Sequence, residues 1–365
     1  FEGKISIYKI QNGEIEVKAE YDMLRSIYPE IESVQIGTQT WATSNFEAVA
    51  TPIGNVIGEV TSNINTNIVV NGTFDADTNW NKASLVTISS GKINIPSGAG
   101  VNTTQSYAGY KVNYYYKITF TISNYVSGII KIGIGGSTAE FLQGNADGTF
   151  SKYLKFTGAT AMIFINNSSS FVGSVDDLII EEIGWANSTE LYNGLIAQGS
   201  TVANATKEAA MWCHYSNSAA NGAIYGKLYN WYAVKLLQTD IDAYNTANPT
   251  NRWGWHVPTQ AEFNTLATYL GGASVAGGKL KKEGLTYWNT PNTGATNESG
   301  FSAIGGGYRN ASGSFTNRTG GVYFVTITNS GIYFTYYALD ASSISLLSSE
   351  FANKIFGISL RLIKD

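Results

Sequence analysis

The side chains best suited to nucleophilic or general-base chemistry are the single cysteine, Cys213, and the two histidines, His214 and His256. A cysteine and a histidine can transfer an acyl group when the thiol lies within hydrogen-bond reach of the imidazole. Neighbours in sequence rarely aim at each other, however, and no orienting residue accompanies this pair. We therefore predict that Cys213 is a small buried apolar residue. His256 directly precedes a helix cap and is expected to pack there, so we predict that the protein is not an enzyme.

Cofactor chemistry also lacks a sequence signal. The chain contains no zinc motif, phosphate-binding loop or dinucleotide fingerprint, so no cofactor is expected and no metal ligand is assigned. Asp176 and Asp177 could contribute oxygen ligands to a structural calcium ion. They could equally lie on a solvated strand edge, and the sequence leaves both interpretations open.

The composition limits the kinds of partner. Charged residues make up 14% of the chain, against about 25% in typical soluble domains, so Asn, Ser, Thr and Gly must cover the surface. Such a surface suits neutral, hydroxyl-rich partners outside the cell. The net charge of −4 and the lack of basic runs argue against nucleic acid, and no apolar stretch is long enough for membrane insertion. One cysteine excludes an intrachain disulfide. Because the sequence starts at Phe1 and not at Met, we expect a natural N-terminal segment to precede it.

Two stretches of the chain show β patterns. Residues 1–33 are expected to form a short β segment and a connector, because Asn12-Gly13 between apolar alternations is a hairpin signal. Residues 67–183 show short alternating runs separated by Gly, Ser and Asn turns, which is typical of an all-β sandwich. We expect its first and last strands, near Val69 and Leu178, to lie side by side.

Helix signals return after Gly184. Thr259 and Glu262 form a capping box ahead of apolar residues with helical spacing, which predicts a helix that ends at Gly271-Gly272. A second, weaker helix is predicted over Tyr225–Val234.

Residues 67–183 resemble a known fold family. The opening Asn71-Gly72-Thr73-Phe74, the tryptophan Trp80 and the paired aspartates of the closing strand are similar to a carbohydrate-binding-module-like jelly roll. If this jelly roll binds sugar, exposed aromatic residues such as Trp80 or Tyr107 would make the contact, although a core position is the favoured interpretation for Trp80.

The remainder of the chain resembles the Fibrobacter succinogenes major paralogous domain. The resemblance implies an α+β C-type-lectin-like domain, similar also to formylglycine-generating enzymes, formed by residues 34–66 and 184–365 with the jelly roll inserted in an early loop. The strings that carry it are Val34 to Trp41 with Ser44-Asn45-Phe46, Trp212 to Tyr215, Tyr225 to Val234, Gly254 to Phe263, Gly277 to Lys281, Trp288 to Phe301, Gly306-Gly307-Tyr308-Arg309 and Gly357 to Arg361.

A ligand-binding face is predicted between Tyr308 and Lys354. This stretch is dominated by Ser, Thr, Asn, Gly, Tyr and Phe, the mixture that antibody paratopes favour, although an ordinary Ser/Thr-rich β surface would have the same composition. The resemblance favours the first interpretation, because related domains carry the variable regions of diversity-generating retroelements here. Departures from the family pattern give the predicted ligand-binding residues: Asn310, Ser312, Thr316, Asn317, Tyr323, Phe324, Tyr333, Tyr337, Ser342, Ser345, Ser349 and Phe351.

The side-chain period of a β-strand assigns faces within this stretch. Alternation places Tyr333, Thr335 and Tyr337 on one side and Phe334 and Tyr336 on the other. We predict that the first side is exposed to the ligand and that the second packs inward.

The family resemblance, taken with the composition, implies an extracellular receptor-binding adhesin at the tip of a phage tail fibre, on the virion, that recognises a protein or glycan on Bacteroides-like host bacteria. The alternative is a cell-surface or secreted lipoprotein adhesin of the bacterium itself. We also expect a homotrimer, because several linked sites strengthen attachment, and no nucleic-acid or membrane partner.

Overall fold

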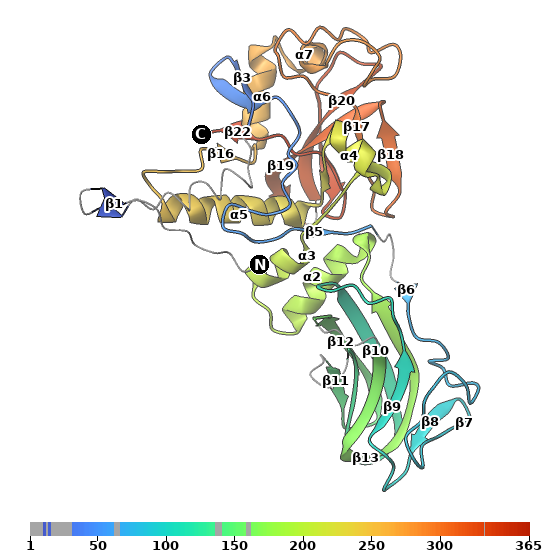
Figure 1. The fold of residues 1–365 in the computed structure, drawn as a ribbon. Coiled ribbons are helices and arrows are strands. Elements are labelled where there is room, and N and C mark those ends of the chain that lie inside the picture. The colour runs from blue at the N-terminus through green and yellow to red at the C-terminus, as the bar shows by residue number, and fades with distance from the viewer. Residues whose placement is uncertain are drawn as a thin grey trace. The chain divides into compact units, whose positions relative to one another are not determined.

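The computed structural model describes residues 10–11, 14–15, 31–61, 66–135, 141–157, 162–331 and 333–365. The chain divides into two compact units, shown in Figure 1. We call Phe1–Thr61 with Val202–Asp365 the split unit and Ser62–Thr201 the inserted unit. Near the start of the chain, β1 (Ile10–Gln11) pairs antiparallel with β2 (Glu14–Ile15), as the hairpin signal predicts; the turn residues Asn12 and Gly13 lie outside the described residues.

The inserted unit is built on one eight-stranded antiparallel sheet. Its longest strands, β10 (Tyr115–Ile134) and β13 (Met162–Glu182), pair with each other. β12 (Gly148–Lys155) pairs with the first part of β10, and β11 (Phe141–Gly144) pairs with its last part. The two ends of β10 therefore have different neighbours. The remaining strands are β6 (Thr66–Asn67), β7 (Thr87–Ser89), β8 (Lys92–Ile95) and β9 (Asn102–Ser106).

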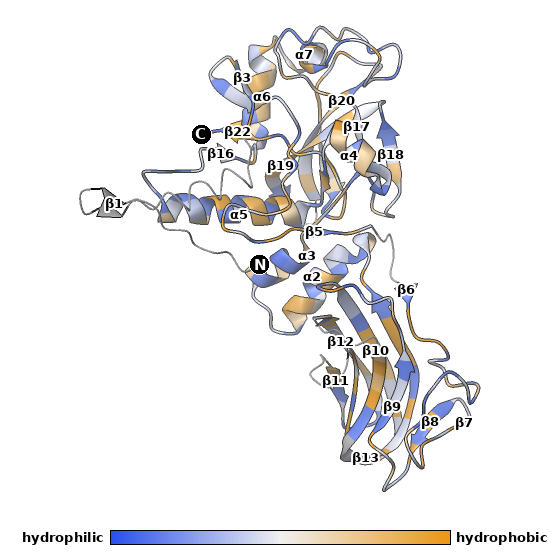
Figure 2. Ribbon diagram, in the orientation of Figure 1, coloured by the Kyte–Doolittle hydropathy of each residue, from blue (hydrophilic) through white to orange (hydrophobic). Residues whose placement is uncertain are grey.

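Buried side chains that alternate with more exposed ones along the strands form the core of this unit. Every second residue from Tyr116 to Ile122 is buried, and the corresponding change in hydropathy along β10 is visible in Figure 2. Trp80 also belongs to this core, at 8% exposure, where its indole nitrogen donates to the Asn71 carbonyl. Trp80 is therefore mainly a core residue.

The two ends of the inserted unit lie side by side, as predicted. The Ile68 amide donates to the Ile180 carbonyl at 2.8 Å, and the Leu178 amide donates to the Gly72 carbonyl at 2.9 Å. Pairing of β6 with the end of β13 continues this contact.

The sheet of the inserted unit ends with β13 at Glu182, close to the predicted boundary at residue 183, but the compact unit continues to Thr201. The unit also contains a 3-10 helix, η1 (Trp185–Asn187), and α2 (Ser188–Ala197). Glu190 on α2 accepts hydrogen bonds from Lys117 at 2.7 Å and from Tyr153 at 2.8 Å, and the Gln198 side chain accepts from the Tyr153 amide at 2.6 Å. These contacts attach the helix to the sheet, so the compact unit extends to residue 201.

Besides the β1–β2 hairpin, the described residues of the split unit form two short sheets and one larger one. The larger sheet has the order β18-β17-β19-β20-β21, with β18 (Phe315–Arg318), β17 (Gly306–Arg309), β19 (Gly321–Ser330), β20 (Tyr333–Asp340) and β21 (Leu347–Asn353). The short sheets combine β3 (Ser33–Ile36), β4 (Gln39–Ala42), β16 (Trp255–His256) and β22 (Ile363–Lys364) in one, and β5 (Gly58–Glu59), β14 (Met211–Cys213) and β15 (Leu228–Tyr229) in the other.

One helix prediction is confirmed and the other is wrong. α6 (Gln260–Tyr269) begins with the complete Thr259–Glu262 capping box. In place of a helix over Tyr225–Val234, β15 is followed by α5 (Trp231–Ala247), because Asn230 caps α5 by accepting from the Ala233 amide. The other helices are α3 (Val202–Ala209), η2 (Tyr215–Asn217), α4 (Ala219–Tyr225) and α7 (Ala273–Leu280).

α6 covers one face of the larger sheet. The ring of Phe263 on α6 stacks on Tyr337 of β20 at a centroid distance of 4.5 Å. Trp41, Phe301 and Phe324 belong to the same buried cluster. The opposite face of β17, β19 and β20 therefore carries the residues that alternate with this core.

Candidate binding face

Four aromatic rings form a continuous row on the face of the larger sheet opposite α6. Tyr308 lies 4.7 Å from Tyr323, and Tyr323 lies 5.7 Å from Tyr336, both with edge-to-face geometry. Phe356 stacks on Tyr308 at 5.8 Å. We call these four residues the tyrosine row. All four are half-buried, so each ring is held by its neighbours while part of its surface remains accessible.

Backbone pairing fixes the row in place. Gly307 pairs with Val322, which brings Tyr308 beside Tyr323. The segment 357–359, which follows β21, bonds to both β17 and β19. The Arg309 amide donates to the Gly357 carbonyl at 2.8 Å, and the Ser359 amide donates to the Tyr323 carbonyl at 3.0 Å. The three tyrosines thus lie on strands that are bonded on both sides, and Phe356 lies in the turn that follows β21.

Asn317 sets the position of the central ring. Its side-chain amide donates to the Tyr323 hydroxyl at 2.9 Å. Burial, together with Tyr308, Tyr336 and Asp340, raises the pKa of Tyr323 against the opposing effect of the Asn317 hydrogen bond. The Tyr323 hydroxyl is therefore neutral at physiological pH. The hydroxyls of Tyr308 and Tyr336 have no hydrogen-bond partner among the described residues and are available to a ligand.

Small polar residues and one aliphatic residue surround the row. Thr316 is exposed and pairs with Tyr308, and Ser349 is half-buried and pairs with Tyr336. Leu347 of β21 is 52% exposed and pairs with Ala338 of β20, and Ala338 in turn pairs with Tyr323 of β19. Directly paired residues on antiparallel strands share a face, so these residues frame the rings.

Four of the predicted ligand-binding residues belong to this face: Thr316, Asn317, Tyr323 and Ser349. Tyr308, Tyr336 and Phe356 were not predicted. Tyr308 belongs to the Gly306-Gly307-Tyr308-Arg309 string that carries the family resemblance, and a search for departures from the family pattern passes over such a residue. Tyr336 was assigned to the core.

The predicted strand phase is wrong for Thr335, Tyr336 and Tyr337. Pairing between β20 and both of its neighbours is irregular between Phe334 and Tyr336. Phe334 and Thr335 are consequently both buried, Tyr336 faces outward, and Tyr337 lies in the core at 3% exposure. Phe324, also predicted to bind ligand, is 1% exposed in the same core. These two rings support the binding face from below.

The other predicted residues lie outside the row. Asn310 and Ser312 form a turn, in which the Asn310 side chain accepts from the Ser312 hydroxyl and the Ser314 amide. Ser342 bonds to Asp340, and Ser345 donates to the Ser274 carbonyl on α7. Tyr333 is 39% exposed at the start of β20. The side chain of Phe351 lies outside the described residues.

The residues considered for catalysis do not form an open site. Cys213 is fully buried, and burial raises the pKa of its thiol to about 12. The neighbouring His214 lies against Trp212, with ring centroids 5.1 Å apart. A buried, protonated thiol is a poor nucleophile.

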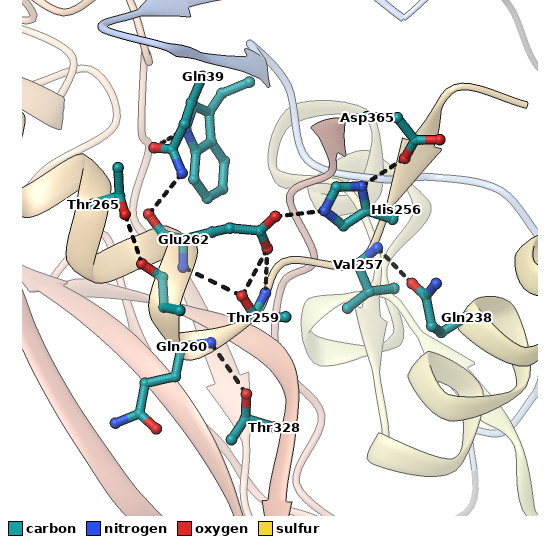
Figure 3. A network of polar contacts seen from close by, with 12 residues as sticks. Gln39, Gln238, His256, Val257, Thr259, Gln260, Glu262, Thr265, Thr328 and Asp365 are labelled. Carbon is teal, nitrogen blue, oxygen red and sulfur yellow. Dashed lines mark hydrogen bonds and ion pairs between the residues drawn. The ribbon is translucent and has the colours of Figure 1, made fainter.

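His256 belongs to the polar network shown in Figure 3. Its two ring nitrogens contact Glu262 at 2.7 Å and Asp365 at 2.8 Å. Glu262 also accepts from the Thr259 amide and hydroxyl at the start of α6. Burial lowers the pKa of His256, but the two carboxylates outweigh this and raise it above its ordinary value. The imidazole on β16 therefore connects the residue that follows β22 to the cap of α6.

The described residues show neither a metal-binding cluster nor a membrane-spanning helix. Within the described ranges, no group of three or more His, Cys, Asp or Glu side chains could hold a metal ion. The Asp176 side chain accepts from the Asp177 amide at 2.7 Å. No helix in the described part of the chain is long and apolar enough to cross a membrane.

Comparison with known proteins gives a family match. The family model of the Fibrobacter succinogenes major domain matches residues 185–364. No curated protein matches the chain.

Solved structures give only weak likenesses. The enzymatically active domain of tailspike protein 4 from bacteriophage CBA120 is 20% identical, covering 32% of this chain and 21% of that one, with a TM-score of 0.24. The module BiXyn10A CBM1 is 10% identical over 34% of this chain and 97% of its own, with a TM-score of 0.23. The mannan-binding module from Man5C is 14% identical over 29% and 93%, with a TM-score of 0.22. TM-scores this low establish neither a shared fold nor a shared ligand.

Proposed function

We propose that this chain, whose residues 185–364 form a Fibrobacter succinogenes major domain, is a non-catalytic adhesin that recognises a bacterial surface ligand through the tyrosine row. The observation that carries this proposal is the row itself, in which Tyr308, Tyr323, Tyr336 and Phe356 are in ring contact yet partly accessible on a bonded sheet.

The row has the physical properties of a binding hot spot. Aromatic side chains offer a large contact area and lose little conformational entropy on binding. Neighbouring rings already restrict them here, which reduces the entropic cost further. The frame of Thr316, Asn317 and Ser349 supplies hydrogen-bonding groups without charge, in keeping with the low charge of the whole chain.

Binding without catalysis is the function that these groups favour. The Cys213 thiol is buried and protonated, and His256 is engaged on both ring nitrogens. The tyrosine row offers rings, hydroxyls and an amide, which can hold a ligand but include no group suited to general-base catalysis at neutral pH.

The finer parts of the proposal concern fold and biological setting. We infer a C-type-lectin-like fold for the split unit and a jelly-roll fold for the inserted unit, from the motifs quoted above. We place the protein outside the cell, as a homotrimer at the tip of a phage tail fibre, with the tyrosine row in the region that diversity-generating retroelements vary. A cell-surface or secreted lipoprotein adhesin of the bacterium is the alternative.

Attachment of the purified protein to intact bacteria tests the proposal. Fluorescently labelled protein is incubated with a panel of Bacteroides-like strains and measured by flow cytometry, beside a variant with Tyr308, Tyr323 and Tyr336 all replaced by Ser. We expect saturable binding to some strains and its loss in the variant. Binding that is equal in both proteins would refute a role for the row.

A further inference from the structure

A second surface of the split unit has the features of a ligand site. A hollow of about 700 Å³ lies between the β3–β4 turn and the outer side of α6. Because α6 covers the face of the sheet opposite the tyrosine row, this hollow is separate from the binding face described above. Its volume is within the range of small-molecule sites, about 300–1,000 Å³.

An exposed aromatic ring forms one wall of the hollow. Tyr269, at the end of α6, is 64% exposed, and its ring lies against Gly37 in the β3–β4 turn. A Cβ atom at Gly37 would lie 2.7 Å from Tyr269 Cδ2, so any larger residue would displace the ring. Gly37 also has a φ of +61°, which non-glycine residues rarely adopt. The turn is therefore shaped to hold this ring on the surface.

An oriented amide also lines the hollow. The Tyr337 hydroxyl, reaching out from the core, donates to Asn264 Oδ1 at 2.7 Å. No described residue accepts from Asn264 Nδ2, which leaves this donor to a ligand. One turn further along α6, the Thr268 hydroxyl donates to the Asn264 carbonyl at 2.8 Å, and its oxygen can still accept.

The chemistry of these groups defines the ligand. The residues that line the hollow include no Lys, Arg, His, Asp or Glu, so nothing there would compensate a charged ligand. A flat ring can stack on the C–H face of a pyranose, while an amide donor and hydroxyl acceptors match its hydroxyl groups. We propose that the hollow binds a neutral pyranose of a glycan, with Tyr269 as the platform and Asn264 as the donor.

The experiment measures binding of neutral oligosaccharides to the intact protein. The panel contains manno-, gluco-, galacto-, xylo- and N-acetylglucosamine oligomers, and affinity is measured by saturation-transfer NMR and calorimetry. We expect at least one to bind. Tyr269→Ala should weaken that binding by about tenfold or more, whereas Tyr269→Phe, which keeps the ring, should bind nearly as well as the wild type. Gly37→Ala should also weaken binding, because it displaces the ring.

Two controls accompany these variants. Arg252→Met, which changes an exposed residue outside both surfaces, should leave oligosaccharide binding unchanged, and the melting temperature of each variant shows whether it is folded. Failure of the intact protein to bind any oligosaccharide of the panel would overturn the proposal. So would binding that survives Tyr269→Ala. Attachment to cells through the row is a separate measurement and can succeed or fail independently.

Discussion

At the scale of single residues, buried cations hold the split unit together through oxygen atoms that carry no formal charge, and Lys281 and Arg361 are two of them. Lys281 donates to the carbonyls of Thr293, Asp340 and Ser343. Arg361 donates to the carbonyls of Ala42 and Phe301 and to the Asn45 side chain, and burial lowers its pKa to about 9. Each cation joins segments far apart in the sequence, which a single sequence does not reveal.

Replacement of Arg361 should therefore be costly. Arg361→Met removes the donor and leaves several buried acceptors unsatisfied, so we expect the free energy of unfolding to fall by about 3 kcal/mol. Arg252→Met is the matched control, because Arg252 forms an exposed ion pair with Asp365, and such pairs contribute less than about 1 kcal/mol. Urea denaturation of both variants measures the difference; equal losses would contradict the role assigned to Arg361.

His256 should make stability depend on pH. Its raised pKa means that protonation favours the folded state, so this stabilisation is complete below its ordinary pKa of 6.5 and is lost as pH rises through the folded-state pKa. The pKa of Glu262 is lowered despite burial, mainly by His256 and Thr259, so its contribution is present above 4.5 and is lost as pH falls. We expect the network to contribute most between these limits.

The measurement compares unfolding free energies at mildly acidic and alkaline pH. The wild type should lose stability toward alkaline pH, and His256→Gln should lose less. His214→Gln provides the control, because burial lowers the pKa of His214 and its removal should not reduce the alkaline loss. An unchanged alkaline loss in His256→Gln would show that the network does not contribute in this way.

At the scale of elements, the sequence correctly predicted those features of helices and strands that depend on residues close together in the chain. The capping box of α6 and the alternation of β10 are both present in the structure, because each depends on neighbours in the sequence. The phase of β20 was mispredicted because an irregularity in pairing with β19 and β21 breaks the alternation at Thr335. That irregularity depends on two other strands, so it reversed the faces of Tyr336 and Tyr337.

The capping box gives an element-scale prediction. Thr259→Ala removes the side-chain acceptor for the Glu262 amide and one of the donors to its carboxylate, and should lower the free energy of unfolding by about 1 kcal/mol. Thr265→Ala is the control, since Thr265 is exposed within the same helix and bonds only to the preceding turn. Thermal melting of the two variants tests the prediction, which fails if Thr265→Ala is the more harmful change.

At the scale of the whole molecule, the sequence predicted an inserted β unit over residues 67–183, and the last strand of that sheet ends at Glu182. The composition changes at Gly184, where helix signals begin, and the family model matches from residue 185. η1 and α2 lie within that match but pack on the inserted sheet, so they belong to the compact inserted unit. A helix that packs on a neighbouring sheet through Glu190 and Gln198 cannot be assigned to that sheet from sequence alone.

This boundary can be tested with two fragments. A fragment of residues 62–201 should fold and melt cooperatively, whereas a fragment of residues 67–183 should melt at a lower temperature. The shorter one lacks the Lys117–Glu190 ion pair, the Tyr153–Glu190 hydrogen bond and the buried Trp185. Calorimetry of both provides the comparison, and equal melting temperatures would contradict the extended boundary.

In the proposed function, the outward face of β20 binds the ligand while its inward face packs in the core. Substitution of two adjacent tyrosines on β20 tests this most directly. Tyr336→Ala and Tyr337→Ala are compared for melting and for attachment to a strain that binds the wild-type protein. We predict that Tyr336→Ala loses attachment with nearly unchanged melting, and that Tyr337→Ala loses about 3 kcal/mol of stability. Full attachment by a folded Tyr336→Ala variant, or collapse of the fold in that variant alone, would contradict the account.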